Sequence, residues 1–175
     1  MTGGAPEFSR PVSLTRLGKE PLCQEIAANA EERVALARRL DLVSLDRLSA
    51  TVDLAPQRDR TILLTASFAA EFVQSCVVTL DPVGGAIAEN FSLRYGPPGW
   101  ESEIAGDEDE PAFEPLSGTT IDIGEAVAQE LALALPPFPR VPGTSVETEL
   151  GGDAEARREP GPFAGLVRLV GRGAK

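Results

Sequence analysis

The sequence has 175 residues, 42% of them apolar, which is enough for one domain with a single core. Its formal net charge of −11 leaves it without the basic surplus with which proteins grip the phosphates of nucleic acids. Histidine is absent, and this excludes every catalytic triad, dyad or zinc site that needs an imidazole.

The composition also indicates a cytoplasmic protein without disulfides. The chain contains no run of about 18 apolar residues, and its start, MTGGAPEFSR, lacks the basic and apolar parts of a secretory signal. Cys23 and Cys76 lie far apart, so we expect both to be free thiols in a reducing compartment.

The N-terminal part of the chain is predicted to supply two extended pieces and a helix. Residues 7–17 read as a strand held at a sheet edge by Pro11, and a short strand follows around 22–27. Asn29 and Glu32 form a capping box that starts a helix up to Leu40. The side chains expected to face inward are Phe8, Val12 and Leu14 in the strand and Val34, Leu36, Ala37 and Leu40 in the helix.

Three later stretches alternate apolar and polar residues with the period of two that is typical of half-buried strands. They are residues 48–54, 61–76 and 87–95. Turns are predicted at 55–60 and 81–85, and the glycine pairs at 84–85 and 151–152 are also read as turns. Together these strands predict an antiparallel sheet with one apolar face that needs a cover.

A second helix is predicted from Asp122 to Leu135. Asp122 caps its start, Glu125 completes a capping box, and Pro136 and Pro137 end it. An apolar stripe runs along one side, through Ile123, Val127, Leu131 and Leu135. Leu133 lies off this stripe and is expected to widen the buried face.

The whole chain is thus predicted to be a single α+β domain over residues 1–175. Its antiparallel sheet, either open or partly closed like a barrel, is covered by two helices. Residues 97–118 are expected to form a flexible acidic loop, and residues 144–161 a flexible linker to a C-terminal tail motif.

Three stretches carry a resemblance to a known family. They are QSCVVTLDPV at 74–83, IDIGEAVAQELALALPPFPRVPG at 121–143 and GPFAGLVRL at 161–169, preceded by FSRPVSLTRLG near the start. In this order and spacing they resemble the YceD family, called large ribosomal RNA subunit accumulation proteins. The resemblance implies a cytosolic protein, bacterial or plastid, that supports accumulation of large-subunit ribosomal RNA and has no established catalytic activity.

The chain departs from this family pattern at one point. Many relatives have Cys-x-x-Cys where this chain has Cys76, Val77, Val78 and Thr79, and some have further cysteines where it has PFPRVPG. One cysteine without histidine cannot supply the four ligands of a usual zinc site, so we expect no metal and no cofactor. Cys76 is read as a small buried residue rather than a reactive thiol.

The leading functional hypothesis is a monomeric, non-catalytic binding protein. Seven acids and no base occupy residues 101–114, and they suit a basic ribosomal protein or a precursor of the large subunit as partner. The alternative for this stretch is a loop that serves only solubility. The candidate partner-binding residues are Asp107, Glu108, Asp109, Glu110, Asp81 and Phe163, and Asp81 could equally shape a turn.

The alternative function is direct RNA binding by the C-terminal tail. The last 25 residues carry five bases against three acids, a local charge of only +2. The RNA-binding candidates are Arg157, Arg158, Arg168 and Arg172. No set of residues supports an enzyme, since the paired carboxylates Asp122 and Glu125 lack a nucleophile or metal ligand beside them.

Overall fold

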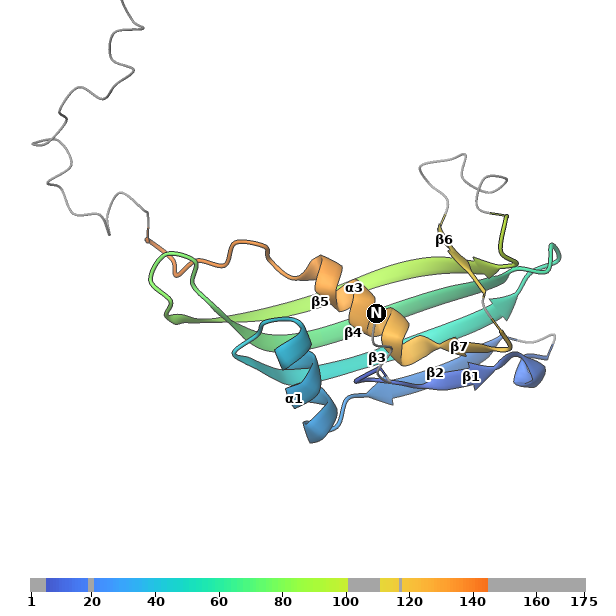
Figure 1. Ribbon diagram of the computed structural model, residues 1–175, viewed down its shortest axis with the longest axis horizontal. Helices are drawn as coiled ribbons and strands as arrows, with labels where there is room; N and C mark the ends of the chain where they lie inside the picture. Colours follow the sequence, from blue (N-terminus) through green and yellow to red (C-terminus); the bar gives the residue numbers. More distant parts are fainter. Residues whose placement is uncertain (1–5, 19–20, 101–110, 117, 145–175) are drawn as a thin grey trace, which may run out of the picture.

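The computed structural model describes residues 6–18, 21–100, 111–116 and 118–144. Within them the chain forms two α-helices, one short 3-10 helix and seven strands (Figure 1). In chain order they are β1 (Pro11–Ser13), the 3-10 helix η1 (Leu14–Arg16), β2 (Leu22–Ala27), α1 (Ala30–Arg39), β3 (Ser44–Pro56), β4 (Ile62–Ser75), β5 (Pro82–Gly96), β6 (Ala112–Pro115), β7 (Thr120–Asp122) and α3 (Ile123–Ala134).

Five strands form one sheet in the order β2-β3-β4-β5-β6. The first four are antiparallel neighbours, whereas β6 runs parallel to the end of β5. Among the described residues β2 and β6 do not pair with each other, so the sheet is open and the alternative of a partly closed barrel is wrong. The predicted α+β class with two covering helices is confirmed.

Both helices cover the same face of this sheet, and α3 crosses it diagonally (Figure 1). The inward side chains of β3 and β4 alternate as predicted, and Leu48, Leu64 and Phe68 are among those that pack under the helices. From α3, Val127 and Leu131 are fully buried in the same core. Burial on one face is what produced the period of two in the sequence.

The helix ends follow the predicted capping residues. The Asn29 side chain accepts a hydrogen bond from the Glu32 backbone N–H, and the Glu32 carboxylate accepts one from the Asn29 backbone N–H, so the capping box is confirmed. At α3 the Asp122 carboxylate accepts from the backbone N–H groups of Gly124 and Glu125. The Glu125 side chain does not complete a box there, because it forms an ion pair with Arg39 instead.

The N-terminal segment reaches the sheet through a second, two-stranded sheet. In it β1 pairs with β7 directly before α3, so Pro11 lies opposite Asp122. Phe8 and Val12 are buried as predicted. The long extended piece expected over 7–17 is shorter in the structure, because η1 follows β1 at Leu14.

Four other predictions need correction. Gly84 and Gly85 lie inside β5 rather than in a turn, and a Cβ on Gly85 would lie 2.7 Å from two ring carbons of Phe72. This glycine therefore makes room for an aromatic ring. Val34 and Leu133, expected to face inward, are 52% and 80% exposed. Residues 112–115, placed in the acidic loop, form β6.

The outer edge of β5 is largely open. β4 pairs with the whole strand on one side, from Pro82 to Tyr95, without a register shift. On the other side β6 pairs only with Leu93–Gly96. Among the described residues the backbone of 83–92 has no strand partner on that side, where Figure 1 shows β5 as the upper border of the sheet.

Candidate functional site

Glu130 on α3 lies within electrostatic reach of two other carboxylates, one from the middle of β5 and one from β6 at the end of that strand. Glu89 comes from β5, Glu114 from β6 and Glu130 from α3, and we call these three residues the acidic corner. None of them forms an ion pair with another described residue. The acidic corner is therefore a local excess of negative charge rather than part of a salt-bridge network.

Two neighbouring groups titrate as a negative field predicts. Partial burial, with the carboxylates of Glu89 and Glu114, raises the pKa of Glu130. Burial, and then the charges of Glu114, Asp122 and Glu130, raise the pKa of Tyr95 to about 12. This part of the surface thus favours a cation.

The acidic segment predicted from the sequence attaches at this corner. It leaves the sheet after β5 and returns through Pro111 into β6, which carries Glu114. Asp107, Glu108, Asp109 and Glu110 lie outside the described residues. Both ends of the segment are nevertheless fixed at the same end of the sheet as the acidic corner.

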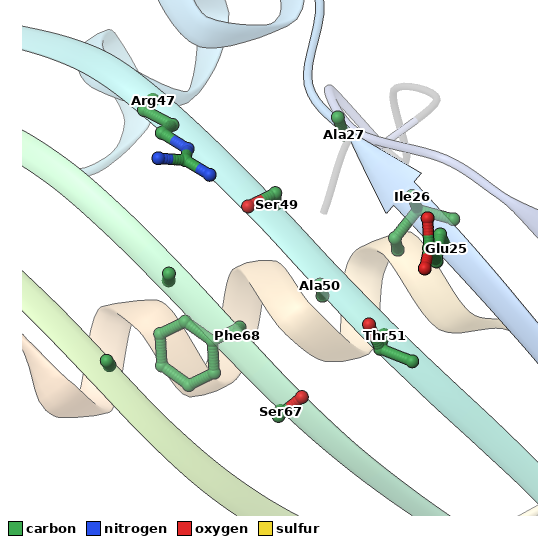
Figure 2. Close-up of a pocket in the computed structure, with 11 residues that line it drawn as sticks. Glu25, Ile26, Ala27, Arg47, Ser49, Ala50, Thr51, Ser67 and Phe68 are labelled. Atoms are coloured by element: carbon green, nitrogen blue, oxygen red, sulfur yellow. The ribbon is translucent and has the colours of Figure 1, made fainter.

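The face of the sheet opposite the helices carries a shallow hollow of about 690 Å³ (Figure 2). Small side chains line it, among them Ser49, Thr51 and Ser67, and in Figure 2 the strands lie in front of α3. Its charged groups are Glu25 and Arg47, and Arg47 lies 3.7 Å from Glu71 in an exposed ion pair. Glu25 lies opposite Thr51 in the register of β2 and β3, so a carboxylate and a hydroxyl are neighbours in this hollow.

A second exposed surface lies where α3 ends. A groove of about 610 Å³ runs between the loop after α1, the end of β4 and the prolines after α3. Val43, Val77 and Leu133 expose apolar side chains along it. Asp81, a predicted partner-binding residue, is exposed in the nearby turn between β4 and β5, where its carbonyl accepts from the Cys76 backbone.

Cys76 lies at the centre of this turn and is fully buried, as predicted. The backbone N–H groups of Val78, Thr79 and Val141 each approach its Sγ at 3.5 Å. Hydrogen bonds from the Thr79 hydroxyl, then from the Thr79 and Val141 backbone, lower the pKa of Cys76 to about 6 despite its burial. The cysteine thus ties the loop after α3 to the β4–β5 turn.

This arrangement predicts a pH dependence of stability. Because the pKa of Cys76 is lower in the folded chain than in the unfolded chain, the folded state binds fewer protons between pH 6 and the ordinary thiol pKa of about 8.5. The free energy of unfolding should therefore increase as the pH rises through this window. Below pH 6 the contribution of the Cys76 thiolate should be lost. Urea unfolding of Cys23→Ser, which keeps Cys76, measures this rise.

The control is the double variant Cys23→Ser/Cys76→Ser, whose stability should change less over the same window. The chain has no histidine that would titrate there, so the comparison is clean. Thiolate absorbance gives a second readout, with a midpoint near pH 6 for Cys76, whereas a hydrogen bond with Asp53 raises the pKa of Cys23. Equal pH profiles for the two variants would contradict the prediction.

Other predicted site residues lie beyond the part of the chain that the structure describes. They are Phe163, Arg157, Arg158, Arg168 and Arg172. Among the described residues there is no cluster of three or more potential metal-ligating side chains, and no helix is long and apolar enough to cross a membrane.

Sequence reasoning missed Glu89 and Glu130 as members of a site. Glu89 follows the inward alternation of Ile87 and Phe91, and an acid at an inward position of a strand was a signal that could have found it. Glu130 lies beside the apolar stripe of α3 and had no such signal. The parallel pairing of β6 places Glu114 opposite Tyr95, from where its charge reaches Glu130.

One comparison with known proteins gives a match. The sequence model of the family described as "Large ribosomal RNA subunit accumulation protein YceD" matches residues 64–169, which is more than half of the chain. No curated protein and no solved structure gives a significant match.

Proposed function

The chain belongs to the YceD family of large ribosomal RNA subunit accumulation proteins, and from this we propose that it binds a basic ribosomal protein during assembly of the large subunit. The family description gives the process, accumulation of large-subunit ribosomal RNA. The partner is our inference from charge. We further propose that the protein acts by binding in the cytoplasm, as a monomer and without catalysis.

The acidic corner is the observation that supports this partner most strongly. Glu114 lies on β6 and follows the four consecutive acids at 107–110 by four residues in the chain, so these acids are joined to the sheet beside a carboxylate. Ribosomal proteins that bind RNA carry the opposite charge, and such a surface can cover that charge until RNA replaces it. Complementary charge also speeds the encounter of the two proteins.

Neutralising the acidic segment should weaken this binding. The variant Asp107→Asn/Glu108→Gln/Asp109→Asn/Glu110→Gln keeps side-chain size and removes four charges. If each exposed contact contributes about 0.4 kcal/mol, the loss is roughly tenfold in affinity at low salt and smaller at high salt. The measurement is capture of ribosomal proteins from cytosol by the tagged chain, at two salt concentrations and after nuclease treatment.

A matched control neutralises four acids elsewhere, by Glu147→Gln/Glu149→Gln/Asp153→Asn/Glu155→Gln, which changes net charge equally. Capture should survive in this control. If the first variant captured ribosomal proteins as well as the unaltered chain does, the segment would serve only solubility. Capture that disappears with nuclease in the unaltered chain would instead indicate RNA or a whole precursor particle, and would direct attention to Arg157 and Arg158.

A further inference from the structure

The open edge of β5 has few of the features that keep natural sheet edges unpaired. Exposed edges are usually short, bulged, or protected by proline and lysine. Here residues 83–92 keep regular register with β4, and Glu89 is their only charged residue. Such an edge is a template for one more strand.

The inward side chains along this edge form an apolar–acidic–apolar pattern. Ile87 and Phe91 are partly buried against the core, and the Phe91 ring meets Phe68 edge-on at 6.1 Å. Glu89 lies between them and shares its negative field with Glu130. A strand that completes this edge needs an apolar residue, a cation and a second apolar residue at alternate positions.

The chain itself contains a segment with this pattern beyond the described residues. In AGLVRLV, residues 164–170, Leu166, Arg168 and Val170 alternate in the required order, and Val167 and Leu169 add β-forming character. The family model runs from residue 64 to 169 and so includes the β5 edge and this segment up to Leu169.

We propose that residues 164–170 pair with the open edge of β5 as an additional strand, in which Arg168 lies beside Glu89 and Glu130 and is flanked by Leu166 and Val170. The backbone of β5 supplies the hydrogen bonds, Ile87 and Phe91 supply the apolar contacts, and the two acids select the arginine. The matching pattern is symmetric about Arg168, so it fits either strand direction.

The path of the chain allows this pairing. Val141 N–H contacts Cys76 Sγ, and the Cys76 backbone N–H binds the Asp81 carbonyl immediately before β5, so the described chain ends near the start of that strand. A random-coil chain of about twenty residues has a root-mean-square span of roughly 25 Å. The middle of the open edge lies about 17 to 20 Å along β5 from its start.

This pairing goes beyond the binding of a ribosomal protein. Arg168 would pair with Glu89 and Glu130 of the acidic corner, whereas Glu114 and the acids at 107–110 would stay available to a basic partner. The pairing also gives Arg168 a structural partner and removes it from the set of RNA-binding candidates. The proposed function and the added strand can therefore fail separately.

Amide hydrogen exchange of the full chain tests the added strand. The outward-pointing N–H groups of 83–92 should be protected in the unaltered protein and lose this protection in Arg168→Glu. The exchanged pair Glu89→Arg/Arg168→Glu should restore it. Lys175→Glu, the same charge change beyond the segment, should leave it intact.

Molecular mass from light scattering separates this pairing from exchange between chains. A monomer with a protected edge supports the proposal. A dimer whose protection disappears on dilution overturns it in favour of the tail of a second copy. The proposal is also overturned if the β5 edge is unprotected in the unaltered protein, or if Arg168→Glu leaves its protection unchanged. It is overturned as well if Arg168→Glu alters protection only in the groove around Val43 and Pro136.

Discussion

Leu131→Ala should lower the free energy of unfolding by about 2 to 5 kcal/mol, because it leaves a cavity where α3 meets the sheet. The Leu131 side chain is 0% exposed and packs in the core between α3 and the sheet. Urea unfolding followed by circular dichroism measures the loss. Binding of the partner should weaken as well once a sizeable fraction of the protein is unfolded.

The matched control is Leu133→Ala, two residues further along the same helix. Its side chain is 80% exposed, so the same truncation should change stability by less than about 0.5 kcal/mol. Equal losses at the two positions would contradict the burial of α3 in this orientation. Such losses at both positions would instead match the wider buried face that the sequence predicted.

Sequence analysis correctly predicted the elements in which many residues share one requirement, such as burial on one face of the sheet. Along β3 and β4 every second side chain faces the helices, so a period of two repeats over a dozen positions and is unmistakable. The caps of α1 and α3 depend on contacts within three residues, and they were predicted from Asn29 and Asp122.

The missed elements are short or depend on distant partners. β6 and β7 have four and three residues, too few to show a period, and each is fixed by pairing with a remote segment. Glu125 was assigned to a capping box from its spacing, but Arg39 on α1 forms an ion pair with it. Spacing along the chain cannot reveal such a competitor.

Only part of the candidate site could be predicted from the sequence, because the rest depends on residues that are distant in the chain. Acids that are consecutive in the sequence, at 107–110, could be read directly, whereas Glu89 and Glu130 come together with Glu114 only after the sheet and α3 have formed. The charge of this surface is thus partly local and partly a product of the fold.

Asp122→Ala should be the second severe substitution, with a loss of about 2 to 4 kcal/mol in the free energy of unfolding. The Asp122 carboxylate accepts from the backbone N–H groups of Gly124 and Glu125 at 3.1 Å each and so caps α3. It also accepts from the Arg10 N–H at 2.7 Å and from the Ser9 hydroxyl. Alanine leaves all of these donors without their acceptor.

Because these donors belong to two segments, the loss should exceed that of an ordinary helix cap. The helix cap alone accounts for about 1 kcal/mol, and the bonds to Ser9 and Arg10 hold the N-terminal segment against the start of α3. Hydrogen exchange should therefore increase both at Phe8–Ser13 and in the first turn of α3. The measurement is urea unfolding combined with exchange at these amides.

Asp122→Asn is the informative control, since its side-chain oxygen can still cap the helix while the charge is lost. Its Oδ1 can still accept from the backbone N–H groups of Arg10 and of the first turn of α3, so protection there should largely remain. The Ser9 hydroxyl, which donates to Oδ2, loses its acceptor, and the segment should loosen there. If alanine cost no more than an ordinary cap, β1 and β7 would be holding the N-terminal segment without help from this carboxylate. The pairing of Val12 with Ile121 would then be the contact to disrupt.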